Sequence, residues 1–286
     1  MDSLETCRQI LKRSGSSFAL AFRILPERQR DAMTAFYAFC RQVDDDVDRE
    51  VDPEKARLAI ETWKRRIDAV YSGCPDHDSI GHALLWAKDR FSIRKRHLDL
   101  IIEGVELDLV RNRFETFEDL YEYCYRVASA VGMVVLSILG AKNGEADLYA
   151  ELTGLAVQMT NILRDAGEDA ANGRIYLPRE DLELFGVREG ELLQRRMTEP
   201  VKRLLRFEAA RTRHFYGMAE AALKPEQRHR FYFAEALRET YWMLFRQLEA
   251  RDFMVFRDRI SIGKREKIVV ALKHRLHPSV LASNWL

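Results

Sequence analysis

The chain has no excess of charge of either sign, since 46 Lys and Arg residues face 45 Asp and Glu residues among 286 positions. A balanced charge argues against a nucleic-acid-binding protein, which needs a basic surface. Basic residues gather only in short runs, which are typical of solvated helix surfaces. The run near the C-terminus, RDRISIGKREK, also fits contact with an anionic membrane surface. We therefore expect no nucleic-acid partner, and we keep peripheral membrane contact as an open expectation.

The sequence also lacks paired cysteines and long hydrophobic runs. Its four cysteines lie far apart and form no CxxC pair: Cys7, Cys40, Cys74 and Cys124. This spacing excludes a typical zinc site or a disulfide framework and is typical of reduced thiols in the cytosol. The N-terminus has no apolar core of a signal peptide, and no run approaches the ~20 apolar residues that span a bilayer. We expect a cytoplasmic protein, at most peripheral at the inner face of the membrane.

Strand-like alternation is scarce, whereas apolar residues recur at helical spacing through most of the chain. Within residues 33–48 they follow at intervals of three, four and four, which predicts one buried helical stripe: Phe36, Phe39, Val43 and Val47. Further amphipathic helices are expected over residues 55–71, 79–90, 95–111, 117–140, 146–169, 200–222, 225–250 and 264–276. No linker, low-complexity segment or repeat interrupts this pattern. The sequence predicts one all-α domain over residues 1–286, a bundle of eight or more helices around a central space.

Two stretches of the chain each hold a pair of aspartates four residues apart. They are RQVDDDVD, with Asp44 and Asp48, and NILRDAGED, with Asp165 and Asp169. On a helix this spacing puts both acids on one face, where they repel each other by about 0.2–0.5 kcal/mol. A divalent cation between the acids removes the repulsion, and oxygen-only ligands without His or Cys favour Mg²⁺. The pairs therefore predict a site that binds a diphosphate through magnesium.

Polar partners accompany each aspartate pair on its helical face. At about 100° per residue, Tyr37 and Arg41 align with the first pair, and Gln158 and Asn161 align with the second. A chance surface stripe explains one such set, but two sets favour ligands that face inward. Ionising an allylic diphosphate requires its oxygens to be neutralised by metal ions and arginine donors. Arg41 and Arg164 are placed for this role.

The carbocation that ionisation leaves behind needs a dry pocket with aromatic faces and no nucleophile. Six aromatic residues are candidates for its walls: Phe18, Phe22, Tyr37, Phe39, Tyr123 and Tyr241. For any one of them, packing in the core is the competing interpretation.

These residues lie in motifs that resemble the squalene/phytoene synthase family of head-to-head prenyl synthases. The resemblance spans SGSSFALAF, LPERQRDAMTAFYAFCRQVDDDVD, GVELDL, YCYRVASAVG, QMTNILRDAGEDAANGRIYLP and FRDRISIGKREK, which is nearly the whole chain. It implies an all-α isoprenoid-synthase fold with a central hydrophobic cavity and two or three Mg²⁺ ions. Val105 stands where the family more often has Met, and Asp46 adds a third consecutive acid that we interpret as lying beside the metal ligands or facing solvent.

The resemblance also implies roles for individual residues. Asp44 and Asp48 would bind one set of Mg²⁺ ions, and the other set would be bound by Asn161, Asp165 and Asp169. Contacts to the prenyl diphosphates are implied for Ser14, Gly15, Ser16, Ser17, Phe18, Tyr37, Arg41, Gln158, Arg164 and Tyr241, with Tyr176 and Arg259 as weaker matches.

The implied reaction condenses two identical allylic diphosphates. The C1 cation of one is attacked by the C2=C3 double bond of the other, and proton loss closes a cyclopropane such as presqualene diphosphate. A second ionisation can lead to a C30 hydrocarbon, squalene or dehydrosqualene, by proton loss or by hydride from NADPH. The SGSSF start and LPERQRDAMTAFYAFCRQVDD resemble bacterial enzymes that act on farnesyl diphosphate in hopanoid or carotenoid biosynthesis. This resemblance favours farnesyl diphosphate over the geranylgeranyl diphosphate of phytoene synthases. A terpene cyclase and a catalytically inactive partner subunit remain alternatives, and the oligomeric state stays open.

Overall fold

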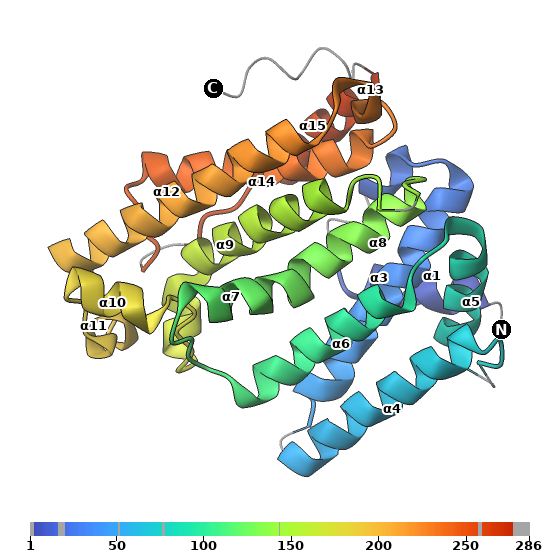
Figure 1. Ribbon diagram of the computed structural model, residues 1–286, viewed down its shortest axis with the longest axis horizontal. Helices are drawn as coiled ribbons and strands as arrows, with labels where there is room; N and C mark the ends of the chain where they lie inside the picture. Colours follow the sequence, from blue (N-terminus) through green and yellow to red (C-terminus); the bar gives the residue numbers. More distant parts are fainter. Residues whose placement is uncertain are drawn as a thin grey trace.

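The computed structural model describes residues 3–16, 21–50, 52–75, 78–142, 144–256 and 259–276, and within these ranges all regular structure is helical (Figure 1). The elements are α1 (Ser3–Arg13), η1 (Phe22–Ile24), α3 (Glu27–Asp48), α4 (Pro53–Tyr71), α5 (Ser79–Phe91), α6 (Lys95–Val110), α7 (Phe117–Cys124), η2 (Tyr125–Ser129), α8 (Ala130–Ile138), α9 (Asp147–Ala171), α10 (Arg179–Phe185), α11 (Glu189–Leu193), α12 (Glu199–Ala222), α13 (Pro225–Arg228), α14 (Tyr232–Ala250) and α15 (Lys264–Leu276). The predicted all-α class is confirmed. None of the described helices is both long and apolar enough to cross a membrane.

Local sequence signals explain where the long helices begin. Asp52 accepts a hydrogen bond from the backbone N–H of Glu54, 3.0 Å away, and Pro53 occupies the first turn of α4. Thr198 caps α12 in the same way through Val201. Such caps satisfy amide groups that have no partner within the helix.

Two of the predicted helices are not regular from end to end. The segment predicted over 117–140 contains η2, a π-helical turn, and the segment predicted over 225–250 is divided into α13 and α14. The π-helical turn lies against α9, where a Cβ on Gly154 would stand 2.5 Å from the backbone nitrogen of Ser129. Ser129 also donates a hydrogen bond to the carbonyl oxygen of Glu151, at 2.8 Å. The close approach of two backbones thus fixes this turn.

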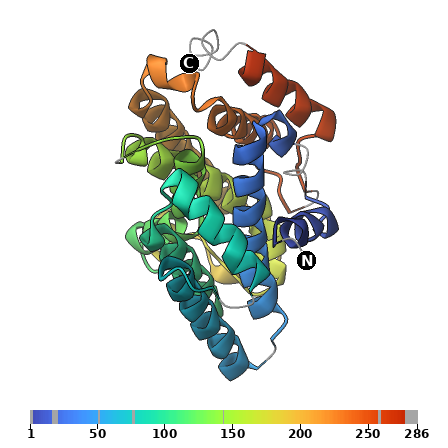
Figure 2. The same ribbon diagram turned by 90° about the vertical axis from the view of Figure 1, so that its right-hand side faces the viewer.

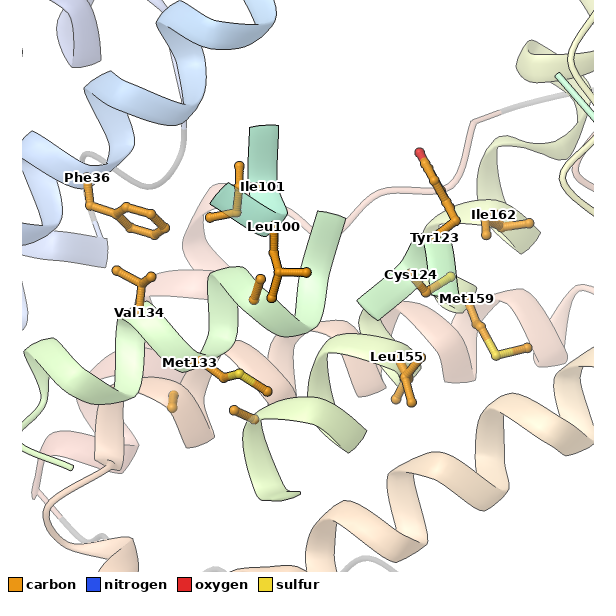
Figure 3. Close-up of a cluster of buried hydrophobic side chains, with 14 of the residues drawn as sticks. Phe36, Leu100, Ile101, Tyr123, Cys124, Met133, Val134, Leu155, Met159 and Ile162 are labelled. Carbon is orange, nitrogen blue, oxygen red and sulfur yellow. The ribbon is translucent and has the colours of Figure 1, made fainter. Parts of the chain in front are cut away.

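The core extends through most of the bundle, and part of it lies between α3, α6, α7, α8 and α9. Figure 3 shows Phe36, Leu100, Val134, Leu155 and Met159 from four of these helices gathered in one buried cluster. The predicted apolar stripe of α3 is buried: Phe36, Phe39, Val43 and Val47. On α9 the sequence predicts a second stripe, of which Leu152, Leu155, Met159 and Ile162 are buried and Ala166 is partly buried. Burying these stripes turns the opposite, polar faces of α3 and α9 away from the core.

A buried network of charged side chains joins α9, α12, α13 and α14. Glu235 accepts hydrogen bonds from Tyr149 (2.5 Å) and from Arg238 (3.0 Å), and it also pairs with Arg228. Arg228 and Arg238 both pair in addition with Glu220, which lies 2.7 Å from Arg228. The break between α13 and α14 brings Arg228 into this network. Each charge has a partner, as buried charges require.

Candidate functional site

Three helices end with an aspartate in the last turn and without a basic residue there. The aspartates are Asp48 at the end of α3, Asp108 at the end of α6 and Asp169 at the end of α9. The C-terminus of a helix carries partial negative charge, so cations are favoured at this position and acids are not. Three such ends with acidic residues create a strongly negative region that a cation would stabilise.

The first acid pair shows this negative potential directly. The pKa of Asp44 is raised to about 7, first because the surrounding protein removes much of its hydration and second because of the charge on Asp48. Asp108 adds to the rise, and the Arg41 guanidinium opposes it. Asp44 is nevertheless accessible to solvent. Without a cation, Asp44 is only partly ionised at neutral pH.

The second acid pair behaves in the same way and borders the same region. The pKa of Asp169 is raised to about 7, first by burial and then by Asp165, while Arg174 opposes the rise. Burial likewise raises the pKa of Asp108, with Asp48 adding to the rise and Arg174 opposing it. Because Arg174 acts on both Asp108 and Asp169, the acids of α3, α6 and α9 belong to one electrostatic cluster.

Asp108 also binds two tyrosines that the sequence analysis selected. Tyr123 donates a hydrogen bond to its Oδ2 at 3.2 Å, and Tyr176 donates one to its Oδ1 at 3.3 Å. The rings of Tyr123 and Tyr176 lie 5.4 Å apart, and Phe114 packs on both at 5.3 and 5.7 Å. Burial, followed by the Asp108 charge, holds the pKa of Tyr123 far above its usual value. The phenol therefore stays protonated, and an aromatic wall stands beside the acids.

Asp108 and Arg174 were not among the candidates chosen from the sequence. Both lie inside motifs that carried the resemblance, GVELDL and NGRIYLP. The available signal was the position of Asp108, an acid, in the last turn of the helix predicted over residues 95–111. Arg111 at the end of that prediction hid it, because α6 ends at Val110 and has no basic residue in its last turn.

Asp165 is covered by two arginines. Its Oδ1 lies 2.8 Å from Arg164 Nε and 3.2 Å from Arg259 Nε, and its Oδ2 also pairs with Arg164. Arg259 extends further to Glu168, at 3.7 Å. Two guanidinium groups thus gather at the acid pair of α9, where a bound diphosphate requires positive charge.

Asn161 presents an oxygen that has no hydrogen-bond partner. Its Nδ2 donates a hydrogen bond to Gln158 Oε1 at 3.3 Å. Its Oδ1 is buried and accepts no hydrogen bond from any described residue. Leaving a buried polar atom unpaired costs about 1–3 kcal/mol, which indicates that a ligand completes this position. As the side chains stand, no three of the described His, Cys, Asp and Glu residues gather closely enough to hold a metal.

The chemistry of the donor set nevertheless fits a divalent cation. It consists of the two acid pairs and the unpaired oxygen of Asn161, all of them hard oxygen donors, in the C-terminal halves of α3 and α9. The same residues were predicted from the sequence as ligands of Mg²⁺: Asp44, Asp48, Asn161, Asp165 and Asp169.

The N-terminal candidates lie beside the first acid helix. Tyr37 donates a hydrogen bond to Ser14 Oγ at 2.9 Å, and the same oxygen accepts from the backbone N–H of Ser16 at 3.3 Å. Gly15 between them has a φ of +63°, which favours glycine. Arg41 pairs with Asp45 at 2.5 Å rather than with the predicted metal ligands. Ser17 and Phe18, both predicted to bind substrate, lie outside the described residues.

Other candidates near α3 have structural partners. Asp46 accepts hydrogen bonds from Trp63 Nε1 (3.1 Å) and from Gln42 (2.7 Å), so it anchors α3 to α4 and does not face solvent freely. Phe39 is fully buried, and its ring packs 5.6 Å from that of Trp63, so core packing is its role. Phe22 is buried between Tyr37 and Phe233.

An apolar cavity of about 420 Å³ lies between η1, α14, α15 and the Arg164 side of α9. This volume falls in the usual range for small-molecule sites, roughly 300–1,000 Å³. Phe233, Ala236, Leu237 and Leu244 line its apolar part, while Arg164 and Tyr241 stand on its wall together with Lys264 and Lys267. Burial raises the pKa of Tyr241, against the influence of Arg164 and Asn161. The cavity therefore joins an apolar space to the arginine-covered end of α9.

The chain resembles known proteins over most of its length. A model of the family described as squalene/phytoene synthase matches residues 11–266. The chain is 34% identical to the phytoene synthase of Arthrospira platensis, over 98% of this chain and 94% of that protein. Among solved structures, a dehydrosqualene synthase superposes with a TM-score of 0.83 at 27% identity, covering 96% of each chain. A squalene synthase from Alicyclobacillus acidocaldarius gives a TM-score of 0.80 at 26% identity, covering 88% of this chain and 94% of that one.

Proposed function

Because the chain belongs to the squalene/phytoene synthase family, and is therefore a prenyltransferase of the head-to-head type, we propose that it condenses two geranylgeranyl diphosphates to a C40 product of the phytoene type. The observation that carries the proposal is the cluster of acids at the ends of α3, α6 and α9, faced by arginines and by tyrosine rings. The named phytoene synthases support the C20 substrate. They favour it over farnesyl diphosphate, which the sequence analysis preferred.

Binding of the diphosphate would use the arginines at the acid pair of α9. Arg164 and Arg259 already offer guanidinium donors there, and Arg41 stands at the first acid pair. Bound Mg²⁺, held by the two acid pairs and Asn161, would neutralise the diphosphate oxygens as the C1–O bond breaks. The oriented donors lower the barrier because they face the charge that develops on the leaving group.

The aromatic and apolar residues would control the carbocation. Tyr123, Tyr176 and Phe114 present ring faces next to the acids, and Asp108 fixes the two hydroxyl groups. The buried cluster of α6, α8 and α9 excludes water that would otherwise capture the cation (Figure 3). The second substrate's C2=C3 double bond attacks C1 of the cation, and loss of a proton closes the cyclopropane. Ionisation of that intermediate and loss of a second proton then give the hydrocarbon.

A C30 synthase acting on farnesyl diphosphate is the second candidate. It is favoured by the close superposition on a dehydrosqualene synthase and a squalene synthase. An inactive partner subunit is the weakest alternative, because Asp44, Asp48, Asn161, Asp165 and Asp169 are all present. The single catalytic domain, the cytoplasmic location, the peripheral membrane contact and the use of NADPH stay predictions from the sequence.

Product analysis with the purified protein tests the proposal. The protein is incubated with Mg²⁺ and either geranylgeranyl or farnesyl diphosphate, with and without NADPH, and the extracted products are identified by mass spectrometry. We expect a C40 hydrocarbon from geranylgeranyl diphosphate that does not depend on NADPH. A C30 product formed only from farnesyl diphosphate would establish the second candidate, and no product from either substrate would support the inactive subunit.

A further inference from the structure

Helix α15 carries two apolar faces, of which only one is packed. Val270, Ala271 and His274 are buried against the rest of the protein. The opposite face holds Ile268, Val269, Leu272 and Leu276, all of them exposed, with 63% of Val269 and 68% of Leu276 accessible. These are four of the eleven large hydrophobic side chains that are exposed in the described part of the chain. Exposed apolar patches of this kind mark interaction surfaces.

The exposed face of α15 is bordered by cations. At about 100° per residue, its four apolar side chains span an arc of about 100°, and Arg265 lies within this arc. Lys264 and Arg275 lie on one side of the arc and Lys273 on the other, so long basic side chains flank the apolar stripe. The helix contains five Lys and Arg residues against one acid, Glu266. An apolar stripe with basic borders is the pattern of helices that lie in the surface of an anionic bilayer.

The orientation of α15 is fixed by its contacts with α14 and with η1. His274 Nε2 lies 2.5 Å from Glu239 Oε2, and Lys273 Nζ lies 3.0 Å from Glu239 Oε1. Arg275 also contacts the carbonyl oxygen of Ile24. Figure 2 shows α15, in red, at the edge of the molecule, with its outer side facing no other helix. The apolar stripe is therefore held outward and is not free to turn into the core.

The same stripe borders the opening of the 420 Å³ cavity. Ile268 and Leu272 are exposed on α15 and also line the cavity, together with Ala271 on the inner side of the helix. Apolar surface thus continues from the cavity wall across α15 to the outside of the protein.

We propose that the outer face of α15, formed by Ile268, Val269, Leu272 and Leu276 between basic residues, docks onto an anionic phospholipid bilayer, so that the cavity opens toward the lipid. The release of product from the cavity into the lipid rests on the proposed function, because a hydrocarbon is more favourable in lipid than in water. Docking itself follows from the stripe and its charge. The cations attract the acidic headgroups, and the four apolar side chains enter the boundary between headgroups and acyl chains.

Vesicle co-sedimentation of the full chain tests the docking without substrate. The vesicles contain either phosphatidylcholine alone or phosphatidylcholine with phosphatidylglycerol. We expect binding to the anionic vesicles, weaker binding at 0.5 M than at 0.1 M NaCl because salt screens the attraction, and little binding to the neutral ones. The double variant Val269→Gln/Leu276→Gln should bind at least tenfold more weakly, and Arg265→Gln should reduce the binding to anionic vesicles.

Matched controls use residues of equal exposure on other helices. Leu58→Gln/Leu184→Gln removes two leucines that are 61% and 70% exposed on α4 and α10, and Lys55→Gln removes one exposed cation of α4. Both should bind vesicles as the unaltered protein does. Equal binding by the α15 variants and these controls would overturn the proposal. So would the absence of vesicle binding by the unaltered protein, or a solution dimer that Val269→Gln/Leu276→Gln dissociates while vesicle binding stays unchanged.

Turnover in detergent micelles separates this inference from the proposed function. Val269 and Leu276 do not line the cavity, so their double variant should retain the turnover of the unaltered protein in micelles. Turnover without vesicle binding would overturn only the docking. Vesicle binding without any prenyl condensation would overturn only the proposed function.

Discussion

Asp46 and Asp48 lie two residues apart on α3, yet their surroundings differ. Asp46 accepts a hydrogen bond from Trp63, which connects α3 to α4, and another from Gln42 of its own helix. Asp48 acts on the pKa values of Asp44 and Asp108 and so belongs to the acid cluster. The helical period separates these roles, since residues two apart point in opposite directions.

Asp48→Asn and Asp165→Asn should each abolish turnover while the helical fold stays intact. Even residues that only orient metal ligands contribute about 10–100-fold to activity, so loss of a ligand should reduce kcat by at least about 100-fold. Steady-state kinetics and circular dichroism measure the two effects. Asp46→Asn is the control and should keep a kcat close to that of the unaltered protein. Unaltered rates in Asp48→Asn or Asp165→Asn would refute the metal assignment.

Asp108→Asn should slow the reaction because the two tyrosine hydroxyls lose their charged acceptor. We expect kcat to fall by about 10–100-fold, the range typical of groups that position others at a metal site. A double-mutant cycle with Tyr123→Phe distinguishes positioning from a general loss of stability. If Asp108 acts through Tyr123, the two losses in kcat should be less than additive. Additive losses, or an Asp108→Asn protein with unchanged kcat, would argue against this role.

At the residue scale, the sequence predicted the acids better than their partners. Helical spacing alone aligned Asp44 with Asp48 and Asp165 with Asp169, because that alignment is a local property of a helix. The pairing of Arg259 with Asp165 joins residues 94 positions apart, and no periodicity contains it. Arg41, in contrast, pairs with an acid four residues further along its own helix, Asp45, because several acids of α3 lie within its reach.

At the scale of elements, the π-helical turn η2 depends on the absence of a side chain at Gly154 of α9. A Cβ at Gly154 would lie 2.5 Å from the Cα and the backbone nitrogen of Ser129, neither of which can rotate away. Gly154→Ala should therefore lower the free energy of unfolding by about 3 kcal/mol, at the upper end of typical overpacking costs. Urea unfolding measures this change.

Gly217→Ala provides the matched control for Gly154→Ala. Gly217 lies in α12, and nothing stands within 4 Å of the position of its Cβ. Alanine is the better helix former there, so this variant should gain about 0.4–1 kcal/mol. If both variants changed stability equally, the close contact of α9 with η2 would not be the cause.

Most long helices were predicted to within two residues, because their apolar stripes repeat over several turns, but α3 begins at Glu27, six residues before the predicted segment. α1 escaped the sequence analysis because its stripe is short, with Cys7, Ile10 and Leu11 as its buried residues. The π-helical turn escaped it because packing against Gly154, and not local propensity, decides it. Tertiary contacts of this kind lie outside any local pattern.

At the scale of the whole molecule, the acid cluster joins helices from both halves of the chain. α3 brings Asp44 and Asp48, α9 brings Asp165 and Asp169, and α6 brings Asp108 between them in sequence. A ligand that bridges these helices should stabilise the entire bundle, since it binds only when the three ends are assembled.

Mg²⁺ together with inorganic diphosphate should therefore raise Tm. At 100 times Kd the pair adds about 2.7 kcal/mol, which corresponds to a rise of roughly 5 °C. Either component alone should give a smaller shift, because the arginines already neutralise Asp165 and the acids repel a free anion. Differential scanning fluorimetry measures the shifts, and Asp48→Asn should abolish the synergy. A Tm that does not respond to the pair would contradict a shared site.

The buried network of Tyr149, Glu220, Arg228, Glu235 and Arg238 has a consequence for the behaviour of the protein on heating. Removing charged groups from water is costly near room temperature, but the hydration of ions becomes less favourable as the temperature rises. The network therefore opposes unfolding more effectively in the heat than in the cold. The network links α9 to α12, α13 and α14. The packing of these C-terminal helices should therefore lose less stability on warming than the packing of the rest of the bundle.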